Sequence, residues 1–477
     1  MSQSDLLFLS ATEAAARIRR RELSPVEYLD AILAHSHRQQ PRINAFATIC
    51  DDQARAHARQ AEAAVVAGAR LGPLHGVPVH IKDLFPTNGV RTSYGSAIYA
   101  DNVPDKDDVL VTRLRDAGAI VFAKSHTPEF GHKGTTDGPA FGITRNPWDL
   151  DRNAGGSSGG AAAAVAAGCG PLGLGTDGAG SIRIPAAYCG VVGHKPTSGV
   201  IPFETAIDAF FSYAAAGPLS RTVADSVLMH EVLVGPHAAD PWSLAAPDFS
   251  RLSPRFVGND LNGLRVGWIP RMANRLVARD VADNARAVLD VLAASGAEVE
   301  EVTEAIDWME MAGRVMYQGN ISVAFGKYVK EWGPKMDPVL LAFIERGSKY
   351  TLSDYRSAQY TRTLLFRAIQ KLFERYDILI SPTLTRTALA VDFDVANDQV
   401  MVDGEPNGIT REGMSPYAYP FNLTGHPSLA LPSGFAADGL PTSVQLTGPW
   451  YSDLDMFRLG AIIEADRPWA QNRPPEA

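Results

Sequence analysis

The stretch from Gly155 to Thr197 constrains the fold more than any other part of the chain. It reads GGSSGGAAAAVAAGCGPLGLGTDGAGSIRIPAAYCGVVGHKPT and holds 12 of the 42 glycines of the protein. Glycine destabilises a regular element by about 0.5–1 kcal/mol relative to alanine, so such a cluster indicates backbone that turns sharply or closely approaches another group. We expect Ser157 and Ser181 to lie in these turns and to take part in the chemistry of the protein.

Charge and composition limit the partners that the chain can bind. The 477 residues are 45% hydrophobic and 20% charged, which is typical of a globular protein with a large core. The net charge of −9 argues against a nucleic-acid partner, because phosphate binding needs clustered Lys and Arg. The one basic cluster, at residues 17–21, falls at the end of an expected helix, where cations are favourable.

Neither a metal site nor a disulfide framework is indicated. The three cysteines, Cys50, Cys169 and Cys189, form no CxxC motif, and the histidines lack the helical spacing of a zinc site. The N-terminus has no signal-peptide pattern, and the uncharged run 153–176 is too broken by glycine and Pro171 to span a membrane. We expect a cytoplasmic protein with no metal, cofactor or membrane partner.

Expected strands and helices alternate along most of the chain. Capping patterns at Ser10 and Ser24 start helices over 11–20 and 25–38, and Val79–Lys82 reads as a short strand. Further expected helices cover 51–67, 108–117, 159–167, 222–233, 280–295, 353–376 and 453–465, with strands at 119–123, 171–175, 264–269, 297–302, 377–381, 428–431 and 443–446. This alternation predicts an α/β fold, a single large domain with a central mixed β-sheet flanked by helices. Residues 125–153 are expected to be irregular, and 235–262 is the best linker candidate within that domain.

Three common motifs match the glycine-rich stretch in form but not in context. The pattern GxGxxG at 173–178 needs a following helix, which Pro185 should limit to about one turn. The pattern GxSxG around Ser157 needs a preceding strand, and 149–153 is polar and not strand-like. A phosphate-binding GxxxxGK[ST] loop fails at 190–196, because the spacing is short and proline takes the last position.

A longer, order-specific pattern remains, and through it the chain resembles the amidase signature family of serine hydrolases. The matching blocks are His75–Asp83 (HGVPVHIKD), Gly155–Gly160 (GGSSGG), Leu174–Pro185 (LGTDGAGSIRIP) and Cys189–Thr197 (CGVVGHKPT). Weaker blocks at 130–134, 144–148, 377–383 and 439–446 extend the match over nearly the whole chain. The resemblance implies one amidase domain over 1–477, with N-terminal helices at 1–70, a catalytic core at 71–235 and pocket elements at 236–477.

The resemblance also implies a Ser–cisSer–Lys triad. By position, Ser181 is the nucleophile, Ser157 is the bridging serine after a cis peptide bond, and Lys82 is the base. The intervals of 75 and 24 residues between them agree with the family spacing. Taken alone, Lys82 could simply end a strand at the surface. As a base it must be neutral, which burial among hydroxyls without a carboxylate partner would achieve, and strand alternation should turn Asp83 to the other face.

The loop before the nucleophile fits an oxyanion hole. Its backbone N–H groups, those of Gly178, Ala179, Gly180 and Ser181, follow one another in a glycine-rich turn that can aim several donors at one point. Ala179 departs from the commoner Gly-Gly-Ser ending of this loop in the family. Four further residues are expected to have supporting roles. Ser158 is expected to be a helix N-cap, and Thr176, Asp177 and Arg183 are expected to brace the loop through hydrogen bonds.

The expected reaction is hydrolysis of a carboxylic amide through an acyl-enzyme. Six aromatic and Met residues stand out in the segment 305–350: Trp308, Met309, Met311, Met316, Tyr317 and Phe325. Core packing is the first interpretation of each, and if some of them line a pocket, the substrate is apolar. We therefore favour aryl or alkyl amides, with aryl esters and carbamates as further classes. The alternative is the glutaminase component of a tRNA-dependent amidotransferase, although 320–328 does not resemble the block expected there. Members of the family are often homodimers, so the resemblance leaves a homodimer open.

Overall fold

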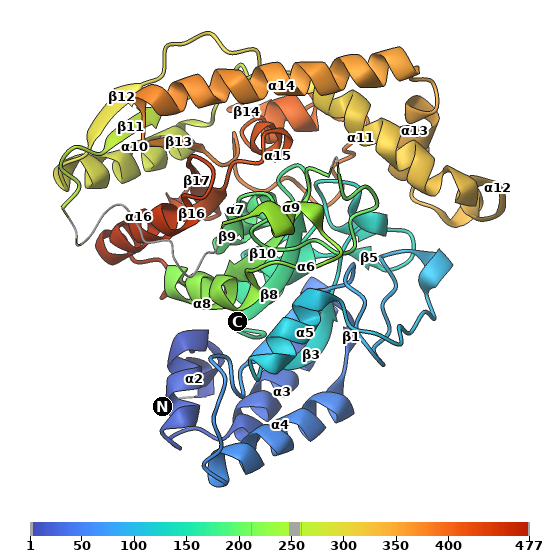
Figure 1. Ribbon diagram of the computed structural model, residues 1–477, viewed down its shortest axis with the longest axis vertical. Helices are drawn as coiled ribbons and strands as arrows, with labels where there is room; N and C mark the ends of the chain where they lie inside the picture. The colour runs from blue at the N-terminus through green and yellow to red at the C-terminus, as the bar shows by residue number, and fades with distance from the viewer. Residues whose placement is uncertain (1–2, 211, 248–257, 259, 476–477) are drawn as a thin grey trace.

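One mixed β-sheet runs through the computed structural model, which describes residues 3–210, 212–247, 258 and 260–475 (Figure 1). Within these residues the sheet has 11 strands, in the order β1-β3-β2-β8-β10-β9-β16-β17-β13-β11-β12. Their bounds are β1 Phe46–Ile49, β2 Pro78–Lys82, β3 Ile120–Ser125, β8 Leu172–Asp177, β9 Val192–Lys195, β10 Ala215–Ser220, β11 Arg265–Trp268, β12 Glu298–Glu301, β13 Ile378–Pro382, β16 Ser428–Phe435 and β17 Pro441–Thr447. The predicted α/β fold with a central mixed sheet is confirmed.

Strand β2 lies between β3 and β8 and is parallel to both. All three strands are buried along their length, as expected of parallel strands covered on both faces. The carboxyl ends of parallel strands meet at the same edge of a sheet. The last residues of β2 and β8 therefore come together. Strand β2 ends at Lys82, and β8 ends at Asp177, directly before the expected catalytic loop.

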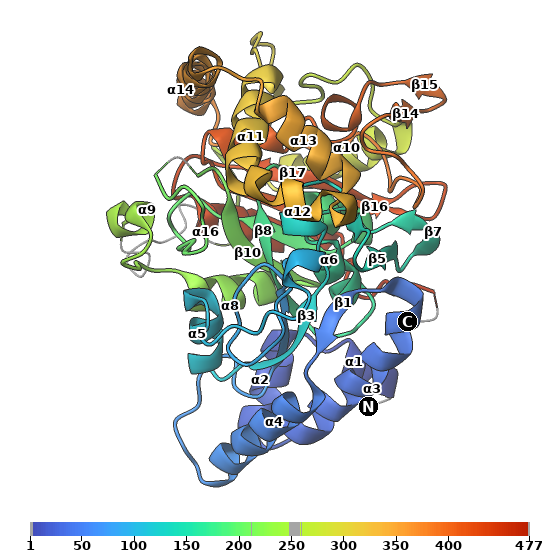
Figure 2. The same cartoon turned by 90° about the vertical axis from the view of Figure 1, so that its right-hand side faces the viewer.

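Helices cover the sheet on both sides and extend beyond it at both ends (Figures 1 and 2). The sheet is flanked by α5 Val109–Asp116, α6 Gly159–Ala166, α7 Arg183–Cys189, α8 Val223–Leu233, α10 Arg279–Ala294 and α16 Asp453–Asp466. One end carries the N-terminal helices α2 Ala11–Arg19, α3 Pro25–Ile43 and α4 Asp51–Val66. The opposite end carries α11 Glu310–Phe325, α13 Pro338–Gly347 and α14 Leu352–Arg375. We call these last three helices the upper helices.

Most of the expected helix starts are confirmed. The hydroxyls of Ser10, Ser24 and Thr222 and the carboxylate of Asp108 each accept a hydrogen bond from the first turn of their helices. The division of the chain at residues 70 and 235 stays a prediction. The linker candidate 235–262 contains the short helix α9 Pro241–Ala245 and lies partly outside the described residues.

Three expectations about local structure are wrong. The segment 149–153 is a strand, β7 Asp149–Asn153, which pairs with β6 Arg145–Asn146 outside the central sheet. The region 125–153 is thus less irregular than its composition suggests. Helix α7 runs for seven residues despite Pro185, because Pro185 stands in the first turn, where an N–H group has no partner within the helix. The strand expected at 171–175 is β8 Leu172–Asp177, so Thr176 and Asp177 belong to the strand and not to the loop after it.

Candidate active site

Lys82 ends strand β2 with its side chain fully buried. Its Nζ donates hydrogen bonds to Ser157 Oγ at 2.6 Å, Ser158 Oγ at 2.9 Å and Thr176 Oγ1 at 2.8 Å. Among the described residues Lys82 forms no ion pair. The carboxylate of Asp83 points elsewhere and accepts from the backbone N–H of Ser93. The amine therefore faces three hydroxyls and no carboxylate at contact distance, as the sequence predicts.

Burial holds the pKa of Lys82 well below its usual value, and the charge of Asp177 opposes that shift only in part. A buried ammonium without a carboxylate partner is costly, so the environment favours the neutral amine. A neutral amine that touches a hydroxyl can accept its proton, which is what a general base must do. The surroundings of Lys82 thus bring a hydroxyl to the amine and lower its pKa, which are two properties that a general base needs.

Ser157 stands at the tip of the turn before α6, and the Gly156–Ser157 peptide bond is cis, as the resemblance implies. A side chain at position 156 would collide with the backbone of Thr135. Glycine is therefore required there by a close approach of two backbones. Ser157 is almost completely buried, yet it lines the large cavity described below.

Ser181 is partly exposed and lines the same cavity as Ser157. Its carbonyl oxygen accepts a hydrogen bond from the backbone N–H of Ser158 at 3.1 Å, which ties the two serine-bearing turns together. In the described part of the chain, no hydrogen bond joins the Ser181 hydroxyl to Ser157. Catalytic hydrogen bonds are often long before substrate binds, so the arrangement remains compatible with a relay.

The loop from Gly178 to Ser181 differs in one respect from the expected oxyanion hole. The backbone N–H of Gly180 donates to Asp177 Oδ1 at 2.7 Å, so in this structure it already has an acceptor, unlike a free oxyanion donor. Gly180 has a φ of +107°, and a side chain there would collide with Ala418. Within the described residues, the N–H groups of Gly178, Ala179 and Ser181 have no hydrogen-bond acceptor, so three donors remain free.

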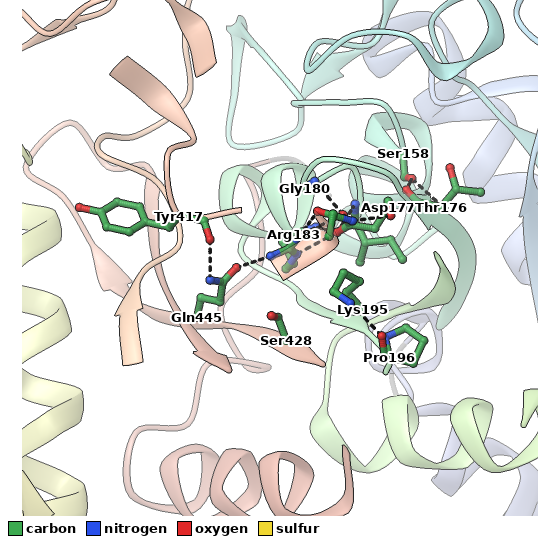
Figure 3. A network of polar contacts seen from close by, with 12 residues as sticks. Ser158, Thr176, Asp177, Gly180, Arg183, Lys195, Pro196, Tyr417, Ser428 and Gln445 are labelled. Carbon is green, nitrogen blue, oxygen red and sulfur yellow. Dashed lines mark hydrogen bonds and ion pairs between the residues drawn. The ribbon is translucent and has the colours of Figure 1, made fainter. Parts of the chain in front are cut away.

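A buried ion pair holds this loop from behind (Figure 3). Arg183 donates from Nε to Asp177 Oδ2 at 2.9 Å and from a terminal nitrogen to Oδ1 at 3.0 Å. Burial alone would raise the pKa of Asp177, but the Arg183 guanidinium holds it well below its usual range. Asp177 also accepts from the backbone N–H of Gly180 and Ile182. These hydrogen bonds join the loop to the buried pair of Asp177 and Arg183.

Two residues of this brace were missed by the sequence analysis. Asn422, in the short helix α15 Tyr419–Leu423, donates to the Asp177 carbonyl at 2.8 Å and accepts from Arg183 at 2.6 Å. Gln445 of β17 accepts from Arg183 at 2.6 Å and donates to the carbonyl of Tyr417 (Figure 3). Both lie more than 230 positions from Arg183, so no local pattern could link them to the loop.

The other two supporting residues act differently from the expectation. Ser158 occupies the N-cap position of α6 but makes no capping hydrogen bond; the Thr136 hydroxyl accepts from Gly159 N–H instead. Ser158 accepts from Lys82 and donates to the Thr176 carbonyl at 3.1 Å. Thr176 was expected to brace the loop, and its hydroxyl instead accepts from Lys82. Both residues therefore belong to the hydroxyl shell of the buried amine.

A cavity of about 1030 Å³ opens in front of the two serines. Its wall is rich in apolar and aromatic side chains from the core and from the upper helices, among them Tyr94, Tyr99, Phe130, Ile184, Tyr317, Phe325 and Met414. Of the residues singled out in 305–350, Tyr317 and Phe325 line the cavity, Met316 and Trp308 pack in the core, and Met311 is exposed. Some of these residues therefore pack in the core, and others line the pocket.

Comparison with known proteins agrees with this geometry. A sequence profile of the family described as Amidase matches residues 27–456. An acylamidase of Rhodococcus erythropolis is 37% identical over 100% of this chain and 99% of its own length. The chain belongs to the amidase signature family. It is an amidase, a hydrolase that acts on the C–N bond of amides.

Other relatives of this amidase, and solved structures similar to it, match almost the whole chain. A glutamyl-tRNA(Gln) amidotransferase component of Acidothermus cellulolyticus is 34% identical over 97% of this chain and 95% of its own length. A bacterial aryl acylamidase has a TM-score of 0.88 at 30% identity, covering 97% of both chains. A 6-aminohexanoate cyclic dimer hydrolase has a TM-score of 0.86 at 29% identity, covering 98% of this chain and 99% of the other.

The described residues contain neither a cluster of metal-binding side chains nor a helix that could span a membrane. No group of three or more His, Cys, Asp or Glu side chains is arranged to hold a metal ion in that part of the chain. Over the same residues, no helix of the amidase combines the length and the apolar character needed to cross a bilayer. The cysteines Cys50, Cys169 and Cys189 are free.

Proposed function

We propose that this amidase cleaves aryl or alkyl amides through an acyl-enzyme formed on Ser181. One observation carries the proposal: the buried amine of Lys82 donates to three hydroxyls, one of them that of Ser157, and Ser157 and Ser181 line the same cavity. A serine hydroxyl needs a base to become a nucleophile, and a neutral lysine behind a relay serine provides one.

The proposed reaction runs in two halves. Ser181 Oγ bonds to the carbonyl carbon while its proton passes to Ser157 Oγ, whose own proton passes to Lys82 Nζ. The oxyanion accepts hydrogen bonds from the free N–H groups of Gly178, Ala179 and Ser181. The C–N bond then breaks, and the amine leaves with the proton returned through Ser157. Water attacks the acyl-enzyme by the same relay, releasing the carboxylic acid and free Ser181.

The preference for aryl or alkyl amides rests on the wall of the cavity and on the relatives. Aromatic and aliphatic side chains make up much of that wall, which suits an apolar substituent on either side of the scissile bond. The acylamidase and the aryl acylamidase among the similar proteins support the same substrate class. Aryl esters and carbamates present the same carbonyl to the same nucleophile and are the further classes to test.

Glutamine hydrolysis for a tRNA-dependent amidotransferase is the alternative, supported by relatives at 34% identity. Glutamine carries a free carboxylate and ammonium, which need charged partners in the pocket. Three of the four Lys and Arg side chains of the cavity wall are already ion-paired, Lys133 with Asp337, and Arg314 and Arg411 with Glu310; the fourth, Arg346, is exposed. We therefore favour the uncharged amide. The cytoplasmic location and the homodimer stay predictions.

A substrate panel tests the proposed function. Purified protein is assayed with p-nitroacetanilide, an aliphatic amide, an aryl ester, a carbamate and glutamine, alongside Ser181→Ala and the control Ser433→Ala, a serine of β16 outside the catalytic cavity. We expect anilide hydrolysis that Ser181→Ala abolishes and Ser433→Ala retains. Hydrolysis of glutamine alone would favour the alternative, and full activity of Ser181→Ala would refute the acyl-enzyme.

A further inference from the structure

The mouth of the catalytic cavity carries the most exposed large aliphatic side chains of the described residues. Val323 is 86% exposed, Leu352 78% and Ile207 76%, and all three line the cavity. They come from helix α11, from the start of α14 and from the segment between β9 and β10. Single exposed apolar residues need no explanation, but three that converge from distant parts of the chain on one opening do. We call these three side chains the rim.

The rim continues inward as an apolar wall. Phe130 and Phe325 stack with ring centroids 4.2 Å apart, and Tyr317 and Ile184 line the cavity between the upper helices and the catalytic loop. The ion pairs of Lys133, Arg314 and Arg411 lower the cost of having these cations in the wall. An apolar group could therefore lie along the wall from Ser181 to the rim.

The size of the cavity points the same way. Pockets that enclose a drug-sized ligand measure about 300–1,000 Å³, so a cavity of about 1030 Å³ is larger than an acetylated aniline requires. We propose that the substrate is an amide with an extended apolar arm, an alkyl chain or a chain of rings, that reaches from the reacting carbonyl at Ser181 to the rim. This inference rests on the proposed amidase function and specifies its substrate class.

A membrane surface is the competing explanation for an exposed apolar rim. Anionic bilayers attract lysine and arginine, and peripheral proteins that bind them place such residues around the inserted side chains. Arg346 also lines the cavity, but Asp208 follows Ile207 directly, and the protein has a net charge of −9. Since the rim also belongs to the cavity itself, we favour the substrate arm as its occupant.

Two homologous series test the inference. One lengthens the acyl chain of p-nitroanilides from two to twelve carbons, and the other lengthens the N-alkyl chain of acetamides. In at least one series, kcat/KM should rise about two- to fourfold per methylene, mainly through KM, until the arm passes the rim. Val323→Ser and Leu352→Ser should each lower the ratio of kcat/KM between the longest and shortest substrates at least fivefold. Val66→Ser, on α4 and 71% exposed, is the matched control and should leave that ratio unchanged.

A binding readout separates failure of this inference from failure of the proposed function. In Ser181→Ala, the Tm shift caused by the same compounds should grow with chain length, and adding Val323→Ser should remove that growth. If short amides are hydrolysed but neither kcat/KM nor the Tm shift changes with chain length in either series, the proposal of an extended apolar arm is wrong and the proposed amidase function stands. Binding to phosphatidylserine vesicles that Val323→Ser abolishes, together with flat series, would assign the rim to a membrane.

Discussion

The Nζ of Lys82 lies 2.6 Å from the Oγ of Ser157, although 75 residues separate them in the chain. The parallel pairing of β2 with β8 explains this proximity, because it places the end of β2 beside the turns that flank β8. The amine is buried, and its hydrogen-bond partners within the described part of the chain are the hydroxyls of Ser157, Ser158 and Thr176. This relationship is the basis of the proposed mechanism and of the first prediction.

Replacing Lys82 should remove the base while preserving the fold. Lys82→Met keeps the length of the side chain, and we expect kcat/KM to fall about 100- to 10,000-fold, the usual contribution of general base catalysis. The matched control is Lys124→Met, a second buried lysine, on the neighbouring strand β3. Lys124 donates to Thr87 and Thr92 and not to a serine of the site. Lys124→Met should therefore lower the free energy of unfolding while leaving kcat close to that of the unmodified protein. Equal kcat losses in both variants would argue against a specific role for Lys82.

The buried Lys195 should make stability depend on pH. Burial lowers its pKa to about 7 from 10.5, so between these values the folded state holds the neutral amine and the unfolded chain the ammonium. The unfolded state then binds more protons, and the free energy of unfolding rises with pH by up to about 1.4 kcal/mol per unit across that window. Lys195→Met should reduce the slope measured by urea unfolding between pH 7.5 and 9.5. An unchanged slope would show that Lys195 stays charged in the folded protein.

The brace behind the catalytic loop should affect turnover more than binding. Asn422→Ala removes the hydrogen bonds to Asp177 and Arg183 that fix the position of the oxyanion donors. We expect kcat to fall about 10- to 100-fold with little change in KM, less than the loss caused by deleting a donor outright. Asn284→Ala, on α10, removes two side-chain hydrogen bonds, to Phe435 and Thr442, that do not involve the catalytic loop, and it serves as the control. A larger change in KM than in kcat for Asn422→Ala would contradict the role.

A buried ion pair should hold the upper helices to the cavity wall. Lys133 contacts Asp337 at 2.8 Å and Asp137 at 2.6 Å; the Asp337 side chain is only 2% exposed, whereas that of Asp137 is 31% exposed. Removing one partner of a buried pair costs about 3–5 kcal/mol, and an exposed pair is worth about 0–1 kcal/mol. Asp337→Asn should therefore lower the free energy of unfolding by at least about 2 kcal/mol more than Asp137→Asn. Similar losses in urea unfolding would contradict the proposed difference.

Local patterns predicted the elements that lie close together in sequence. The capping hydroxyls of Ser10 and Ser24 and the short strand that ends at Lys82 were all readable from spacing and residue type. The same rules failed where position within an element decides the outcome. Pro185 is tolerated because it occupies the first turn of α7, and the polar segment 149–153 forms a strand because it pairs locally with β6.

Long-range contacts set the limit of what the sequence could predict about the site. The roles of Ser158 and Thr176 were misjudged, because both hydroxyls look like local capping or bracing groups until β2 places Lys82 beside them. Asn422 reaches the loop from a distant helix, so no periodicity could reveal it. The engagement of the Gly180 N–H with Asp177 depends on the fold of the turn and not on residue type.

Covalent labelling at Ser181 tests the central claim most directly. A serine-directed fluorophosphonate is reacted with the protein, and the adduct is located by tandem mass spectrometry within the tryptic peptide 153–183, which holds both Ser157 and Ser181. We predict a single adduct on Ser181, none in Ser181→Ala, and much slower labelling in Lys82→Met. An adduct on Ser157, or undiminished labelling of Ser181→Ala, would contradict the account.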